Sequence, residues 1–341
     1  MMALSNSGPA SGDRFVFDTH VHGADLVPAP FRQIHRLANI RTMPRPAGLE
    51  VLAAAGVAAA VVAAVGDPIV TRWYGRSGWR AVTHQLDRLR CAATTAGCRL
   101  ARDAGDVRRG RPSTPAVLLA VEGADAIGTR MERVDELHAR GVRVVVPIHL
   151  KHNQIGTTSM PWQRYAGPLP VRAPSRRGLS AFGRDLVARL DALGIVIDVS
   201  HADTETTLGI IDASHHPVVA SHTGARSVQD FARYLSDEEA TAIAASGGVI
   251  GLWPYFHRRR GVPDADALRD HAAHLAALVG ADHLCIGTDL NGVPGLMAGY
   301  RGPADLPVLV AAMQQAGLDD DEVRGVLGLN FLRVLHRVVG A

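Results

Sequence analysis

Six side chains of the kinds that bind metal ions stand at the far ends of short apolar runs in this sequence. They are His20, His22, Glu122, His201, His222 and Asp289. In a parallel β-barrel the reactive groups lie where each strand ends, because the loops at the carboxyl ends of the strands form the active face. The pattern therefore favours a fold that gathers its strand ends, and it indicates a metal-dependent hydrolase.

The apolar runs alternate with segments of helical spacing. The runs fall at residues 15–17, 57–65, 116–121, 142–148, 195–199, 217–220, 248–253 and 283–287. The helical segments fall at residues 79–104, 131–139, 179–193, 237–245, 264–279 and 319–338. Alternating strands and helices predict parallel pairing, and eight strands are the number that a closed barrel of this kind requires. Because the runs are continuously apolar, both faces of each strand should be buried. We expect an α/β fold, the (β/α)8 TIM barrel.

The length of 341 residues fits a single barrel, so we expect one catalytic domain over residues 14–341. Residues 1–13 are rich in Ser, Gly, Pro and Ala, and we expect a disordered tail there rather than a signal peptide. No apolar stretch approaches the roughly 18 residues that cross a bilayer. We therefore predict a cytoplasmic protein with no membrane partner.

Charge and cysteine content exclude several other classes of protein. The formal net charge is +3 and the arginines are spread along the chain, so nucleic-acid binding is not indicated. Three cysteines, Cys91, Cys98 and Cys285, cannot all pair and form no CxxC motif, so we expect them to be buried and reduced. The sequence contains no Gly-x-Ser-x-Gly elbow, phosphate loop or dinucleotide fingerprint, which disfavours serine hydrolases and nucleotide enzymes.

The number and type of the potential ligands indicate which metal site they form. His20 and His22 project to the same side of an extended segment, although a His-x-His pair alone is common by chance. His201 and His222 each follow a serine at the end of a strand, which strengthens the signal. Four histidines and two carboxylates suit zinc, with other divalent metals left open. Six donors exceed the needs of one ion, so we expect two ions that share a carboxylate and a nucleophilic hydroxide.

Several segments resemble the membrane dipeptidase (renal dipeptidase) family of the amidohydrolase superfamily. They lie at residues 121–123, 141–143 with the following His149, 197–201, 220–222, 247–251 and 286–289. Their order along the chain matches that family from Asp18 to the C-terminal helix. The resemblance implies a zinc-dependent dipeptidase that hydrolyses the peptide bond of dipeptides and tolerates a D-residue on the C-terminal side. The expected partner is thus a dipeptide or another small molecule.

The resemblance also implies roles for individual residues. His20, His22 and Asp289 would hold one ion, His201 and His222 the other, and Glu122 would bridge them. His149 would polarise the scissile carbonyl, and Arg233 would pair with the terminal carboxylate of the substrate. In the mechanism that we expect, Asp289 takes a proton from the water and delivers it to the leaving amine. From its position just past a strand, Tyr255 is expected to line the substrate site or to pack beneath a loop.

Two departures from the family pattern leave the substrate open. His22 stands where the family usually has an aspartate, and Asn291 stands where an acid is common. The alternatives are therefore an amidohydrolase of another specificity, such as an N-acyl amino acid deacylase, a cyclic amidase or a lactonase, and a non-catalytic barrel. Lys151 follows His149 closely, but Glu122 makes a carboxylated lysine bridge unnecessary, so we assign Lys151 to the surface or a lid. The side-chain preference of the enzyme, its metal in the cell and a homodimeric state are left open.

Overall fold

The computed structural model describes residues 14–24, 46–75, 77–166, 169–171, 173–175, 177–257 and 259–340. The tail expected at residues 1–13 lies outside the described residues, as do residues 25–45 of the long connection after the first strand. The predicted division into a tail and a single domain thus stays a prediction.

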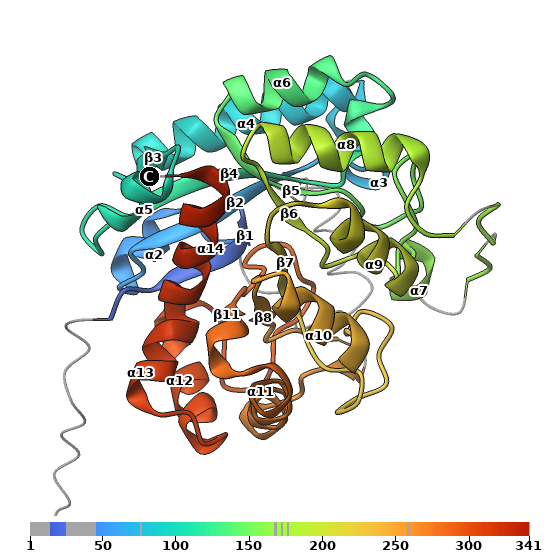
Figure 1. Ribbon diagram of the computed structural model, residues 1–341. Helices are drawn as coiled ribbons and strands as arrows, with labels where there is room; N and C mark the ends of the chain where they lie inside the picture. The colour runs from blue at the N-terminus through green and yellow to red at the C-terminus, as the bar shows by residue number, and fades with distance from the viewer. Residues whose placement is uncertain are drawn as a thin grey trace, which may run out of the picture.

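Parallel strands form a barrel in the centre of the molecule (Figure 1). Eight of them are hydrogen-bonded in the order β1-β2-β4-β5-β6-β7-β8-β11. Their bounds are β1 Phe17–His22, β2 Ala59–Val65, β4 Ala116–Glu122, β5 Val142–Val146, β6 Val196–Asp198, β7 Val218–Thr223, β8 Ile250–Leu252 and β11 Leu284–Ile286. The short strand β3 (Arg99–Ala101) pairs with β4 outside this path. The predicted (β/α)8 barrel is confirmed.

Helices surround the strands (Figure 1). The longer ones are α4 Gly78–Thr95, α6 Glu132–Ala139, α8 Ala181–Ala192, α9 Thr204–Ala213, α10 Asp237–Ala245, α11 Ala265–Val279, α12 Leu306–Gln315 and α14 Asn330–Val339. The shorter ones are α2 Glu50–Ala54, α3 Pro68–Thr71, α5 Ala104–Arg108, α7 Trp162–Ala166 and α13 Asp320–Arg324. At the start of α10 the Ser236 hydroxyl accepts a hydrogen bond from the backbone N–H of Glu239.

Three of the expected boundaries were wrong. The first strand extends to His22, so both histidines belong to β1 instead of following it. The helix expected at 79–104 ends at Thr95, because Gly97 takes a left-handed conformation and β3 follows. The helix expected at 319–338 is interrupted at Gly328, where a side chain would collide with Phe17 of β1. Apolar periodicity does not reveal such close contacts between distant segments. Helix α12 and the hairpin of β9 (Phe256–His257) and β10 (Arg260–Gly261) were not anticipated.

Side chains of β4 alternate between two apolar clusters and thereby orient the end of the strand. Ala116, Leu118 and Ala120 belong to the cluster that fills the barrel, whereas Val117 and Val121 pack against the surrounding helices. Because side chains alternate along a strand, Glu122 continues the inner series. The barrel interior at the carboxyl ends of the strands therefore receives a carboxylate. The amino ends are covered by α14, whose Phe331 contacts the ring of Phe17 edge-on at 5.0 Å.

The barrel closes between β1 and the segment that follows β11. The backbone N–H of His22 donates to Leu290 O at 2.8 Å, and that of Asp289 donates to His20 O at 2.8 Å. The buried Asp18 carboxylate accepts from both the backbone N–H and the hydroxyl of Thr288, at 3.0 and 2.5 Å. Burial raises the pKa of Asp18 to about 6, although the bonds from Thr288 lower it. Asp18 therefore joins the two edges of the sheet through a hydrogen-bonded carboxylate.

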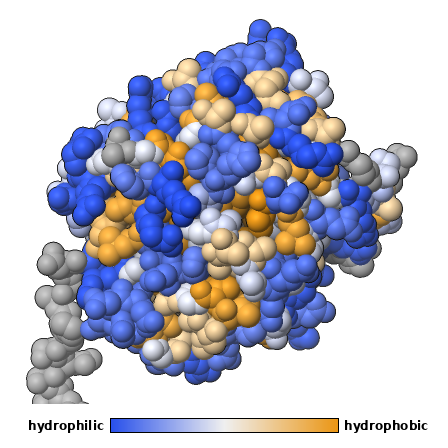
Figure 2. All heavy atoms as spheres, viewed as in Figure 1, coloured by the Kyte–Doolittle hydropathy of each residue, from blue (hydrophilic) through white to orange (hydrophobic). Residues whose placement is uncertain are grey.

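Hydrophilic residues predominate on the outer helices in the view of Figure 2, and hydrophobic residues form separate patches between them. The large apolar side chains that are exposed come from different parts of the fold: Leu100, Leu169, Val228, Leu278 and Leu329. Within the described residues, no helix combines the length and the apolar character needed to cross a membrane. Cys98 and Cys285 are buried as expected, but the expectation was wrong for Cys91, which is exposed on α4.

We expect Thr288→Val to destabilise the metal-free protein by about 1.5–3 kcal/mol, because Asp18 loses a buried hydrogen bond to a charged group. Urea unfolding at pH 8 measures this change. Thr94→Val is the matched control, since the Thr94 hydroxyl bonds to Arg90 O on the exposed face of α4. Its effect should stay within about 0.5 kcal/mol. Equal effects of the two substitutions would contradict the role of Asp18 in closing the barrel.

Candidate metal centre

The structure brings all six predicted ligands together at the carboxyl ends of the strands. Two lie in β1, Glu122 ends β4, and the others lie in β7 or in the loops after β6 and β11. All are buried, with exposed fractions between 0% and 7%: His20, His22, Glu122, His201, His222 and Asp289. We call these six residues the donor cluster. Their convergence follows from the barrel, which places every strand end on one rim.

The distances between the imidazole nitrogens fit metal coordination. His20 Nε2 lies 3.2 Å from His22 Nε2, and His201 Nε2 lies 3.1 Å from His222 Nε2. Two nitrogens on one tetrahedral zinc ion, each about 2.0–2.1 Å from the metal, are separated by roughly 3.3 Å. His22 Nε2 lies 3.4 Å from Asp289 Oδ1, which fits the same ion. The donor cluster thus has the chemistry and the spacing of a metal site.

Glu122 lies between the two pairs of histidines. Its Oε1 is 3.4 Å from His20 Nε2 and 3.1 Å from His201 Nε2. Its Oε2 is 3.3 Å from both His22 Nε2 and His149 Nε2. Glu122 therefore contacts both pairs of histidines, and its Oε1 alone faces an imidazole of each pair. His149 lies as close to Glu122 as the donor cluster does, and with Glu122 and His201 it forms another group able to hold an ion.

Electrostatics favour the ligand forms of several of these groups. Burial, with Arg233 nearby, holds the pKa of His201 well below its usual value, and burial and the neighbouring His20 do the same for His222. Both rings are therefore neutral, the form that binds metals. The pKa of Glu122 is well below its usual value, because His149 and His20 together outweigh the effect of burial. For His22, Asp289 and Glu122 outweigh burial and raise the pKa to about 10.

Asp67, a residue that the sequence analysis missed, contacts His149. The carboxylate is fully buried, and its Oδ2 accepts a hydrogen bond from His149 Nδ1 at 2.5 Å. Its Oδ1 accepts from the backbone N–H groups of Ile69 and Val70 at the start of α3. An Asp before Pro68 is a typical start of a helix, so the sequence contained the signal for the cap. It contained none for the contact with His149, which is 82 residues away.

Asn291, one of the two departures from the family pattern, has a structural explanation. Its side-chain amide donates to His22 O at 2.8 Å and to Ala47 O at 2.9 Å. Its Oδ1 accepts from the backbone N–H of Ala47 at 3.0 Å. A carboxylate could accept the last bond but could not donate the first two. Asn291 therefore fixes the end of β1 that carries His22.

Asp289, a member of the donor cluster, has a strained backbone conformation. Asp289 is a non-glycine residue with a positive φ of 53°, a conformation that costs free energy and is concentrated at functional sites. Its Oδ1 is buried and accepts no hydrogen bond from the described residues. A side chain on Gly292 would collide with this carboxylate and with the ring of His22. Because Gly292 has no side chain, the Asp289 carboxylate can occupy this space.

Arg233 lies next to the donor cluster, with an exposed fraction of 2%. Its guanidinium covers the ring of Trp253, 5.0 Å from the ring centre. Nη1 donates to Ser200 O, Nη2 lies 3.5 Å from His222 O, and Nε has no hydrogen-bond partner among the described residues. Arg233 also contacts Tyr165 of α7, whose pKa burial raises to about 12 although Arg233 lowers it.

Tyr255 is buried and stacks on Trp253, with ring centres 4.3 Å apart and planes 12° apart. Burial raises the pKa of its hydroxyl. The structure thus shows the packing alternative for Tyr255, and its contact with substrate stays a prediction. Lys151 is partly buried in the loop after β5.

A pocket of about 590 Å³ lies beside the donor cluster. Ser159 lines the pocket and donates its backbone N–H to His201 O at 3.0 Å. One backbone hydrogen bond therefore connects the pocket wall to His201 of the donor cluster. Its wall carries the side chains of Arg164, Arg177 and Arg260. Three guanidinium groups thus face two carboxylates, Asp203 and Asp230, of which Asp203 also caps α9 and accepts from Thr157. The pocket is therefore positively charged.

A parallel barrel whose strand ends present histidines and carboxylates around a shared acid defines the metal-dependent hydrolase class. Residues 50–340 match the model of the membrane dipeptidase family, peptidase family M19. The chain belongs to this family.

The chain is also similar to individual proteins in sequence or in fold. The chain is 29% identical over 245 residues to the Dipeptidase tcpJ of Claviceps purpurea, a match that covers 70% of this chain and 55% of that protein. It is 31% identical over 284 residues to an uncharacterized Klebsiella pneumoniae protein in the pqqA 5′ region, covering 80% and 98%. Its fold is similar to that of a metallo peptidase from Rhodobacter sphaeroides liganded with a phosphinate mimic of L-Ala-D-Ala. That match has a TM-score of 0.76 and 23% identity and covers 96% of this chain and 100% of the other.

Asp125, three residues after Glu122, provides a test of how burial shifts the pKa of an acid beside the metal centre. Burial raises its pKa to about 6, with Asn153 Nδ2 donating to its Oδ2 at 3.1 Å. A raised pKa means that the folded state holds the proton more tightly. Stability is therefore lost as pH rises from about 4 through about 6. We expect Asp125→Asn to stabilise the protein at pH 8 by on the order of 1–3 kcal/mol, and by much less at pH 4.5. Urea unfolding at both pH values measures this, and a gain independent of pH would contradict it.

Proposed function

We propose that this protein is a dipeptidase that uses two divalent ions, zinc in the first instance, to hydrolyse the peptide bond of short dipeptides. The observation that carries the proposal is the pair of imidazole contacts at 3.2 and 3.1 Å on either side of Glu122. Membership of the membrane dipeptidase family supports it. The relative of similar fold that binds a mimic of L-Ala-D-Ala suggests that L,D-dipeptides are included.

The donor cluster divides into two sets of ligands. His20, His22 and Asp289 would hold one ion, His201 and His222 would hold the other, and Glu122 would be shared. When bound, two such ions supply an activated water as nucleophile and polarise the substrate carbonyl. The remaining steps depend on side chains of this chain.

Asp289 is suited to carry the proton. Its Oδ1 is buried, free of hydrogen bonds among the described residues and directed toward His22. A carboxylate in this position can accept a proton from the attacking water and return it to the amine that leaves. The strained backbone at Asp289 is consistent with such a role.

His149 is suited to stabilise the oxyanion that develops on the scissile carbonyl. Glu122 first and then Asp67 raise its pKa against the effect of burial, which favours the form with both nitrogens protonated. Nδ1 donates to Asp67, so Nε2 is directed into the centre as the second donor. A donor that is fixed before the reaction begins stabilises the transition state without a cost of reorientation.

Arg233 would bind the free carboxylate of the dipeptide. Nη1 is held by Ser200 O, whereas within the described part of the chain Nε has no hydrogen-bond partner and Nη2 lies 3.5 Å from His222 O; the Tyr165 hydroxyl also contacts this guanidinium. Nε and Nη2 form the side of the guanidinium that can bind a carboxylate with two hydrogen bonds. The lining of the pocket with three arginines includes Ala232, which directly precedes Arg233, so we expect the pocket to favour an acidic side chain in the C-terminal residue.

The test of the function is an assay of the zinc-loaded protein against L,L and L,D dipeptides, including C-terminal Asp and Asn pairs. We expect hydrolysis of dipeptides, and we expect Arg233→Lys to reduce catalytic efficiency on them by about 10-fold or more with unchanged metal content. The same panel includes dipeptide amides, N-acyl amino acids and lactones. Turnover of these and not of dipeptides would replace the proposed function with another amidohydrolase activity. Equal activity of the wild type on dipeptides and their amides would refute the role of Arg233.

We expect Asp67→Asn to lower kcat for dipeptides by on the order of 10²-fold, because His149 loses the charged partner that orients the ring and favours its protonated form. Asparagine also caps helices well, so α3 should stay folded. Metal content and unfolding should match those of the wild type. Asp103→Asn, at the cap of α5 away from the centre, is the matched control and should keep full activity. Wild-type kcat in Asp67→Asn would show that His149 acts without this carboxylate.

A further inference from the structure

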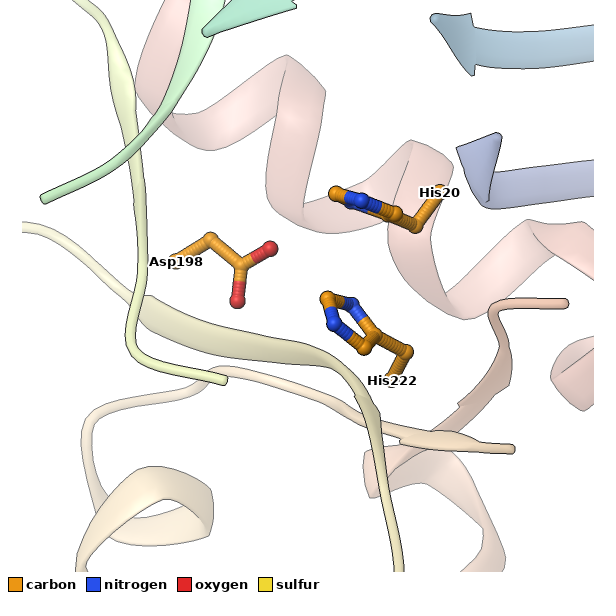
Figure 3. A group of neighbouring side chains, drawn as sticks. All are labelled: His20, Asp198 and His222. Atoms are coloured by element: carbon orange, nitrogen blue, oxygen red, sulfur yellow. The ribbon is translucent and has the colours of Figure 1, made fainter. Parts of the chain in front are cut away.

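A buried carboxylate lies behind the histidine rings, on the side away from Glu122. Asp198 ends β6 with an exposed fraction of 0%, and it continues the inner series of Val196 into the barrel. Figure 3 shows its carboxylate directed toward the rings of His20 and His222. Those two rings lie 4.2 Å apart, and each belongs to a different pair of the donor cluster. Asp198 therefore faces both halves of the metal centre.

Two serines connect Asp198 to these rings. Asp198 Oδ1 accepts from the Ser200 hydroxyl at 2.6 Å and from the backbone N–H groups of Ser200 and Ser221, both at 3.0 Å. The Ser200 and Ser221 hydroxyls are 3.3 Å apart. Ser221 Oγ lies 2.8 Å from His222 Nδ1 and 3.4 Å from His20 Nδ1. The network thus runs from one carboxylate to the Nδ1 atoms of both rings.

The chemistry of these groups sets the direction at the carboxylate end of the network. An ionised carboxylate only accepts, so the Ser200 hydroxyl donates to Asp198 and can accept from Ser221. With Ser221 donating to Ser200, the Ser221 oxygen accepts from the two Nδ1 atoms, which then carry the protons. The Nε2 atom of each ring is left with its lone pair, and Nε2 is the atom that faces the other histidine and Glu122. An outer carboxylate that fixes the tautomer in this way also makes the ligand nitrogen more basic.

We propose that Asp198 is a positioning residue shared by both ions, which acts through Ser200 and Ser221 to hold His20 and His222 in the tautomer that binds metal. The inference rests on the proposed function, because it requires two ions in the donor cluster. It adds that the affinities for the two ions depend on one carboxylate that contacts neither. The Oδ2 atom of Asp198, which has no hydrogen-bond partner among the described residues, adds negative potential behind both rings.

A different interpretation makes Asp198 itself a ligand, since it forms with His20 and His222 one of the groups whose donor atoms lie within 4.8 Å of one another. The hydrogen bonds argue against this. The Nδ1 atom of His222 contacts Ser221 at 2.8 Å, and the Nε2 atoms of His20 and His222 face the other histidines, so neither ring is left with a nitrogen to share an ion with the open Oδ2 of Asp198. The two interpretations predict different numbers of ions in a chain.

The experiment measures zinc affinity and stoichiometry by competition with a chelator, together with the visible spectrum of the cobalt-loaded protein. Asp198→Asn replaces a charged group that only accepts with a neutral amide that also donates, so the direction of the network is no longer set. We expect both ions to bind about 10–100-fold more weakly and the cobalt spectrum to change. Ser221→Ala removes only the hydroxyl that links the network to the rings, and it should weaken both ions as well. If Asp198→Asn fails to fold, Ser221→Ala decides alone.

Glu239→Gln is the matched control, because Glu239 is an equally buried acid that caps α10 outside the network. It should alter stability without altering metal affinity. Wild-type affinity in both network variants, or weakening of a single ion, would overturn the inference and leave the proposed function intact. A third ion in the wild type that Asp198→Asn loses would overturn it in favour of a direct ligand. A wild-type chain that binds fewer than two ions would overturn the proposed function and the inference together, which the dipeptide assay would show independently.

Discussion

The structure of the site depends on one buried negative charge. The Glu122 carboxylate lies 3.1 to 3.7 Å from imidazole nitrogens of five histidines: His20, His22, His149, His201 and His222. A carboxylate out of contact with water is costly unless charges or hydrogen bonds surround it, and here imidazoles from four strand ends do so. The same contacts hold Glu122 ionised, which is the form in which it can bridge two cations. Folding of the barrel and assembly of the site are thus coupled through this residue.

Three of the five imidazoles around Glu122 contact an acceptor through Nδ1, on the side of the ring away from Glu122, and the kind of acceptor differs from ring to ring. His149 contacts the Asp67 carboxylate, His222 contacts the Ser221 hydroxyl, and His22 Nδ1 lies 3.0 Å from Ala63 O. For two of these rings the acceptor matches the role that we infer. A carboxylate favours a protonated imidazole that donates at both nitrogens, as at His149, whereas a hydroxyl that accepts from Nδ1 leaves Nε2 with a free lone pair, as at His222. For His22, whose pKa Asp289 and Glu122 raise to about 10, a bound cation would displace the proton on Nε2.

Sequence reasoning found the residues of the donor cluster more easily than the residues that hold them in place. His201 and Asp289 follow apolar strands directly, and the barrel rule places strand ends together, so their convergence was predictable. Asp67 looked only like a helix cap, and its second contact joins residues 82 positions apart. Asn291 looked like the loss of an acid. Only the folded chain shows that its side-chain amide makes three hydrogen bonds, to Ala47 and His22. No local pattern encodes such pairings.

The sequence by itself determined the strand and helix alternation, the (β/α)8 class and the identity of the donor cluster, because each follows from periodicity and from the chemistry of residues at strand ends. Tertiary structure decided how β1 meets the end of β11 through Asp18, how Gly328 interrupts the last helix and which carboxylate stands behind the rings. These features depend on distances between segments far apart in the chain. Such distances are set by packing of the whole barrel, which no single stretch of sequence specifies.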